Sequence, residues 1–179
     1  MIDATSMLGT FLLSFPGFEN LLNVLVAFLG VLLTGLAVLK FIEIGRFGAQ
    51  PGGVRWITPV MYLMAGAALW NFASSVDSFL ESFYGSSTSV HNLLSYTSSS
   101  RMPEQTKLLL TALIATLRLY GYFTYVRGWL SVRRIGSGQN GSDEVFKAAM
   151  IRLAAGVGLI NIVGTVNAAS STFGFGNVL

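Results

Sequence analysis

The chain has 179 residues, of which 53% are hydrophobic and 11% are charged, and its formal net charge is +3. An average soluble domain carries about 25% charged residues, so this composition excludes an ordinary soluble protein and favours a membrane protein. The chain has no cysteine, which excludes disulfides, thiolate metal sites and cysteine nucleophiles.

Four apolar stretches are long enough to cross a bilayer, for which about 18 residues suffice. They cover residues 20–39, 56–76, 108–130 and 153–179. Each is predicted to form a transmembrane helix. A shorter apolar segment, 7–15, precedes Pro16, and it is either a short interfacial helix or an early extension of the first span.

The basic residues lie mainly beside the loops that follow the first and third spans. They are Lys40, Arg46, Arg55, Arg127, Arg133, Arg134, Lys147 and Arg152. Short cytoplasmic loops are enriched in lysine and arginine, so these loops are predicted to be cytoplasmic. Both termini and the central loop, 77–107, are then predicted to lie on the non-cytoplasmic side.

This topology divides the chain into three parts. Residues 1–76 hold an N-terminal segment and a first helical hairpin, 77–107 form a polar extracytoplasmic loop, and 108–179 hold a second hairpin and a C-terminal tail. The loop is rich in serine. Its serines are either glycan or partner sites, or simply polar residues with turn preferences.

Two regions of the chain repeat each other. The stretch M-A-G-A-A-L-W-N-F-A-S-S-V at 64–76 matches A-A-G-V-G-L-I-N-I-V-G-T-V at 154–166, with an offset of 90. L-L-T-G-L-A-V-L-K at 32–40 also matches L-L-T-A-L-I-A-T-L-R at 109–118, with an offset of 77 or 78. A longer cytoplasmic loop in the second half, at 133–144, would account for the difference. The fold is predicted to be all-α, a membrane protein with four transmembrane helices arranged as two tandem helical hairpins. A duplication of one hairpin explains the two matches, and the alternative is that small residues recur by chance.

Three stretches carry a family resemblance: F-P-G-F-E-N-L-L from Phe15, L-L-T-G-L-A-V-L-K-F-I-E-I-G-R-F-G from Leu32, and A-G-x-x-L-x-N at 65–71 and 155–161. Through them the chain resembles the IcmC/DotE/TraQ-like family of small inner-membrane proteins of type IVB secretion and conjugation systems. Each hairpin resembles a pilin subunit. The resemblance implies a structural component of a DNA- or effector-transfer apparatus, the pilus subunit being one such component.

Arg118 is the most informative single residue, because it lies near the middle of the third span. A charge there costs at least about 2.5–3.5 kcal/mol. With no acid expected at matching depth, Arg118 is predicted to contact a lumen, a lipid headgroup or another subunit; snorkelling or pairing inside the chain is the alternative. Lys40 is its counterpart in the repeat and is assigned the same contact, with a surface ion pair to Glu43 as the alternative.

Small residues let transmembrane helices approach closely. Gly66, Gly156 and Gly158 are therefore predicted to pack helices, with their small-residue faces pressed between subunits. Asn71 and Asn161 occupy equivalent places in the repeat, and they are predicted to hydrogen-bond across helices rather than to coordinate an ion. The aromatic residues that predict an interfacial belt, or else a partner surface, are Trp56, Trp129, Tyr122 and Tyr125.

Enzymatic chemistry is not expected. The G-S-G-Q-N-G at 136–141 has the glycine pattern of a nucleotide-binding loop, but a membrane helix and not a strand precedes it, so it is predicted to be a flexible loop. His91 is the only histidine and supports neither a metal site nor a Ser-His-Asp triad. No catalytic residue, metal or cofactor is expected, and a bound phospholipid is the one ligand that the pilin resemblance implies.

The leading hypothesis is a self-assembling structural subunit of the transfer apparatus. Its partners would be further copies of itself in a homo-oligomer or helical filament, phospholipid and other proteins of the apparatus; no specific nucleic-acid site is evident. The chain would be a multi-pass protein of the bacterial inner membrane, and as a pilin it would become part of an extracellular pilus. The alternative is a small inner-membrane channel or transporter component.

Overall fold

The computed structural model describes residues 4–48, 55–85, 103–135 and 142–175. All regular structure in these ranges is helical, which confirms the predicted all-α class. The described helices are α1 (Ala4–Phe47), α2 (Ile57–Trp70), α3 (Phe72–Tyr84), α5 (Glu104–Ile135), α6 (Ser142–Ile160) and α7 (Ile162–Thr172).

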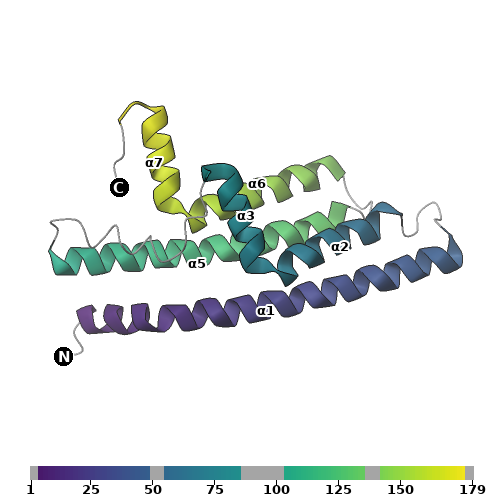
Figure 1. The fold of residues 1–179 in the computed structure, drawn as a ribbon, viewed down its shortest axis with the longest axis horizontal. Helices are drawn as coiled ribbons and strands as arrows, with labels where there is room; N and C mark the ends of the chain where they lie inside the picture. The colour runs from purple at the N-terminus through teal and green to yellow at the C-terminus, as the bar shows by residue number, and fades with distance from the viewer. Residues whose placement is uncertain (1–3, 49–54, 86–102, 136–141, 176–179) are drawn as a thin grey trace.

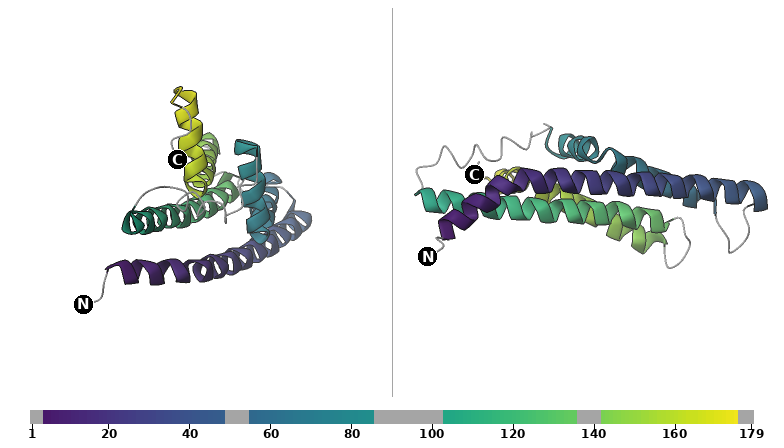
Figure 2. Two further views of the ribbon diagram at one scale, coloured as in Figure 1. Left: turned by 60° about the vertical axis from the view of Figure 1, so that its left-hand side comes forward. Right: turned by 90° about the horizontal axis from the view of Figure 1, so that it is seen from below.

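The long helices form two antiparallel pairs that lie side by side. Helices α1 and α5 run in the same direction, α2 returns along α1, and α6 returns along α5 (Figures 1 and 2). The α5–α6 pair has the most extensive packing, the α1–α2 pair follows, and the two pairs meet where α5 contacts α1 and α2. The C-terminal ends of α1 and α5 and the N-terminal ends of α2 and α6 therefore lie at the same end of the molecule.

Among the helices that the structure describes, two are long and apolar enough to cross a membrane: α1, over Ser6–Arg46, and α5. Helices α6 and α7 add a third only if the pair, bent by 99°, counts as one broken span. The fourth apolar helix, α2, has 14 residues, or about 21 Å at 1.5 Å per residue. By length and composition, the structure thus supports two or three of the four predicted spans.

In each pair, the second helix ends at an asparagine. Asn71 separates α2 from α3 with φ −105° and ψ 58°, and Asn161 separates α6 from α7 with φ −113° and ψ 60°. These angles lie outside the helical region, and α3 and α7 both turn away from the long helices there (Figure 1). Each asparagine carbonyl accepts a 2.9 Å hydrogen bond from the residue four positions on, Ser75 or Thr165. The helix break is therefore repeated along with the sequence.

Replacing Asn161 by alanine is expected to lower the free energy of unfolding by about 1 kcal/mol, because its Oδ1 accepts a 3.1 Å hydrogen bond from the Gly164 N–H at the start of α7. Asn71 forms no such side-chain cap on α3, so Asn71→Ala is the matched control with a smaller loss. Reversible unfolding in detergent micelles, followed by circular dichroism, measures both. Equal losses would contradict a capping role for Asn161.

Helix α1 continues through Pro16. A proline inside a helix removes one hydrogen bond and usually bends the helix without ending it when neighbouring contacts hold both sides. The N-terminal part of α1 accordingly runs at an angle to the rest (Figure 2, right). The 7–15 segment is thus an extension of the first helix, which at 44 residues is about 66 Å long, roughly twice the hydrocarbon thickness of a bilayer.

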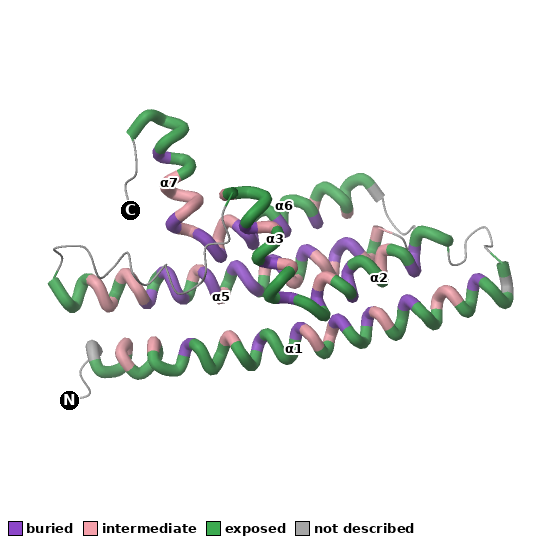
Figure 3. The backbone as a smooth tube through the Cα atoms, viewed as in Figure 1, coloured by how far each residue is buried: buried purple, intermediate pink, exposed green. Residues whose placement is uncertain are grey.

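The core lies where α5 contacts the other helices, and α1 shows mostly exposed residues on its outer side (Figure 3). Tyr122 and Tyr125 are buried in this core, where both pack edge-to-face against Phe72. They are therefore not part of an aromatic belt at a membrane surface. Trp56 is 63% exposed and remains compatible with such a belt.

Candidate functional site

Glycines set the closest approach within each helix pair. A Cβ on Gly66 would collide with Thr34 of α1 and approach the carbonyl oxygen of Gly30. A Cβ on Gly156 would collide with the backbone of Tyr125 in α5. In the same pair, a Cβ on Gly121 of α5 would approach the carbonyl oxygen of Gly156. Helices in contact through their backbones gain van der Waals packing that any larger residue would prevent. Gly66 and Gly156 therefore pack helices within one chain, rather than on an outer surface.

These contacts define how the two hairpins correspond. Gly121 follows Gly30 by 91 residues, and Gly156 follows Gly66 by 90. The first helices thus align with almost the same offset as the second ones, and not with the offset of 77 suggested by the L-L-T match. The second turn is not longer either: Arg133 belongs to α5, and only 136–141 separate α5 from α6, against 48–56 in the first hairpin.

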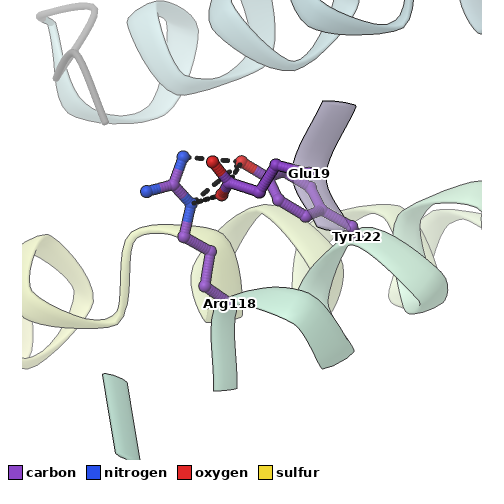
Figure 4. A network of polar contacts seen from close by, with 3 residues as sticks. All are labelled: Glu19, Arg118 and Tyr122. Carbon is purple, nitrogen blue, oxygen red and sulfur yellow. Dashed lines mark hydrogen bonds and ion pairs between the residues drawn. The ribbon is translucent and has the colours of Figure 1, made fainter. Parts of the chain in front are cut away.

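The hairpins enclose a buried charge, Arg118, which is 5% exposed. Its Nε lies 3.1 Å from Oε1 of Glu19 in α1 and donates a 2.9 Å hydrogen bond to the hydroxyl of Tyr122 (Figure 4). Its Nη2 also donates to that hydroxyl over 2.6 Å, and the hydroxyl lies 3.3 Å from Oε1 of Glu19. The guanidinium charge is therefore compensated inside the chain by the Glu19 carboxylate, and the Tyr122 hydroxyl accepts two of its hydrogen bonds.

Sequence reasoning missed Glu19 because it placed this residue just outside the first span. Since α1 is continuous from Ala4, Glu19 lies well inside a helix and reaches the level of Arg118. The premise that no acid lies at matching depth is therefore wrong. The usable signal was the arginine itself, since a charge in a membrane helix normally has a partner.

A cavity of about 300 Å³ opens beside this ion pair. Its polar lining comes from α1, α3 and α5 and consists of Glu19, Asn20, Asn23, Asp77, Arg118 and Tyr122. Its apolar lining includes Phe72, Val76 and Leu80, which recur every four residues on the buried face of α3. The amphipathic helix α3 thus lines one side of this cavity with its apolar face, opposite the ion pair.

Two hydroxyl contacts hold α3 in place. The hydroxyls of Ser75 and Tyr125 lie 2.5 Å apart, which ties α3 to α5. The hydroxyls of Tyr84 and Thr165 lie 2.6 Å apart, which ties α3 to α7. Ser75 and Thr165 are equivalent in the repeat. The fourth residue after each asparagine therefore holds the short helix that follows the break, α3 or α7, through a hydroxyl contact.

The remaining predicted residues lie elsewhere. The Nζ of Lys40 lies 3.9 Å from Oε2 of Glu43 on α1. This is the surface ion pair that was the alternative to a lumen or headgroup contact. Lys40 is therefore not part of the site around Arg118. A Cβ on Gly158 would lie at ordinary van der Waals distance from Thr165 of α7. The carbonyl oxygen of Gly158 accepts a hydrogen bond from the Thr165 hydroxyl. His91 and the 136–141 segment lie outside the described residues.

Comparison with protein-family models, with curated proteins and with solved structures finds no match to this chain.

Proposed function

We propose that this chain is a structural subunit of a bacterial type IVB secretion or conjugative transfer apparatus, embedded in the inner membrane. The observation that carries the proposal is the duplicated hairpin, with its equivalent glycine contacts and equivalent asparagine breaks. Such a unit, two apolar helices joined by a basic turn, is what the pilin resemblance describes. A tandem pair of these units is suited to structural assembly.

In this proposal α1, α2, α5 and α6 cross the membrane as two tandem hairpins with both termini on the non-cytoplasmic side. The basic residues near the C-terminal ends of α1 and α5, which lie at one end of the molecule, support this orientation, because cytoplasmic loops retain lysine and arginine. Helices α3 and α7 then run along the opposite membrane surface. The 99° bend after α6 and the polar outer side of α3 suit that position.

The outer face of α1 supports contact with lipid or with further copies of the chain. Large apolar side chains are exposed along its length, among them Leu13, Val24 and Phe28. Apolar patches of this extent require either a bilayer or a protein partner. We propose that homo-oligomers, and filaments if the chain is the pilin, form through this face, together with phospholipid and other proteins of the apparatus.

Deleting the protein from a cell that carries it is expected to abolish conjugative or effector transfer, with solute uptake unchanged. Mass spectrometry of sheared filaments then tests the role: a pilin is the dominant polypeptide of the filament, whereas a scaffold stays with inner-membrane vesicles. A deletion strain that transfers at the wild-type rate would contradict the proposal in both forms.

A channel or transporter component is the second candidate, and the cavity favours it. The structure brings six polar side chains around one space, and Arg118 is one of them. Polar groups gathered inside a membrane bundle often mark a substrate or ion pathway. A loss of solute or ion flux with intact transfer would favour this candidate over the first.

A further inference from the structure

A second cavity, of about 390 Å³, lies near the C-terminal end of α5. It is lined by Arg127, Leu130, Ser131, Arg133, Arg134 and Arg152. Five of these residues belong to α5, and Arg152 comes from α6. Two helices thus contribute four arginines to the lining of one cavity.

One of the arginines is held by a hydrogen bond from helix to helix. Nη1 of Arg152 donates to Oγ of Ser131 over 2.6 Å, and that hydroxyl donates to the carbonyl oxygen of Arg127 over 2.8 Å. Within the described ranges, no carboxylate forms an ion pair with Arg127, Arg133 or Arg152. The cavity therefore keeps a positive charge that an anion would neutralise.

The positive-inside rule does not explain why these arginines share one hollow, because it requires only that they lie on the cytoplasmic side. The first hairpin meets the same rule with Lys40, Arg46 and Arg55. In the register defined by the glycine contacts, its residues at the places of the four arginines are Leu36, Ile42, Glu43 and Tyr62. The arginine cavity is thus a property of the second hairpin alone.

We propose that this cavity binds the phosphate group of an anionic phospholipid of the cytoplasmic leaflet. The planar guanidinium presents paired donors that match phosphate oxygens, and basic pockets between membrane helices on the cytoplasmic side suit phospholipid headgroups. Arg133 follows Arg118 by 15 residues of α5, which is about 22 Å. Headgroup binding is thus assigned to the C-terminal end of α5 and not to Arg118, whose charge Glu19 compensates. The inference needs α5 and α6 in a membrane, but not a role in transfer.

The test is lipid binding to the full chain in zwitterionic micelles, followed by native mass spectrometry with phosphatidylglycerol and phosphatidylcholine as probes. The wild type is expected to prefer phosphatidylglycerol, and the double variant R133Q/R152Q to lose about tenfold or more of that affinity. The double variant R46Q/R55Q removes two charges at the same end of the molecule, from exposed positions, and is expected to lose less than about twofold.

Equal losses in the two double variants would overturn the cavity as a site, leaving only general charge attraction. Inorganic phosphate is the second probe: if it displaces phosphatidylglycerol and binds equally well alone, the ligand is a free phosphate and the lipid assignment falls. Tighter binding of a short single-stranded oligonucleotide would overturn it in favour of nucleic acid. Should R133Q/R152Q not fold, R133K/R152K keeps the charge without the paired donors, and unchanged lipid affinity in that variant would refute guanidinium recognition.

Discussion

Replacing Glu19 by glutamine is expected to lower the free energy of unfolding by about 3 kcal/mol, because it leaves Arg118 charged and buried without its counter-ion. Glutamine keeps the size of the side chain and one carbonyl acceptor, so the loss reports the charge and not the packing. Reversible unfolding by SDS in mixed micelles, followed by circular dichroism, measures it.

The matched control is Glu43→Gln on the same helix, which removes a carboxylate from an exposed pair with Lys40. That change is expected to cost less than about 0.5 kcal/mol, as is usual for exposed ion pairs. Removing both members of the buried pair, as E19L/R118L, is expected to cost less than E19Q alone, because no lone charge remains. If Glu19→Gln and Glu43→Gln cost the same, the buried ion pair contributes nothing.

Replacing Gly156 by alanine is expected to lower the free energy of unfolding by about 3 kcal/mol, at the upper end for overpacking. The new Cβ would lie within 3 Å of the backbone nitrogen and Cα of Tyr125, and a backbone cannot move aside as the end of a side chain can. Separation of α6 from α5 is the expected result, visible as an increased distance between spin labels on the two helices.

Gly35→Ala is the control. Apart from the neighbouring backbone of α1 itself, no atom lies within 4 Å of the place that its Cβ would take. Alanine has the higher helix propensity, so this variant is expected to be neutral or stabilised by up to about 1 kcal/mol. Gly66→Ala should behave like Gly156→Ala if the two hairpins are equivalent. A Gly156→Ala variant as stable as the wild type would show that the α5–α6 contact is looser than the structure has it.

Local sequence patterns predicted much of the fold. Apolar stretches of span length predicted helices and a membrane class, and the run 153–179 predicted a helix that the structure divides between α6 and α7. The A-G-x-x-L-x-N repeat located the glycines that pack each pair. These features depend on neighbours along the chain or on composition, so a single sequence is enough to reveal them.

The candidate site could not be predicted in the same way. Glu19 precedes Arg118 by 99 residues, and nothing local to either residue indicates the other. Likewise, the arginines of the second cavity look like ordinary topology signals until α6 brings Arg152 against Ser131. Both groupings arise because helices from different hairpins or different halves of one hairpin pack side by side.

The sequence by itself determined the helical class, the apolar surface and one close-packing glycine in each hairpin, Gly66 and Gly156, since each depends on side-chain size or hydrophobicity at regular spacing. Only the tertiary structure decided the register of the two hairpins, the partner of Arg118 and the helix breaks at Asn71 and Asn161. The physical reason is that register and pairing depend on which backbones can approach most closely. That closest approach is set by glycine contacts such as Gly66 with Gly30 and Gly156 with Gly121.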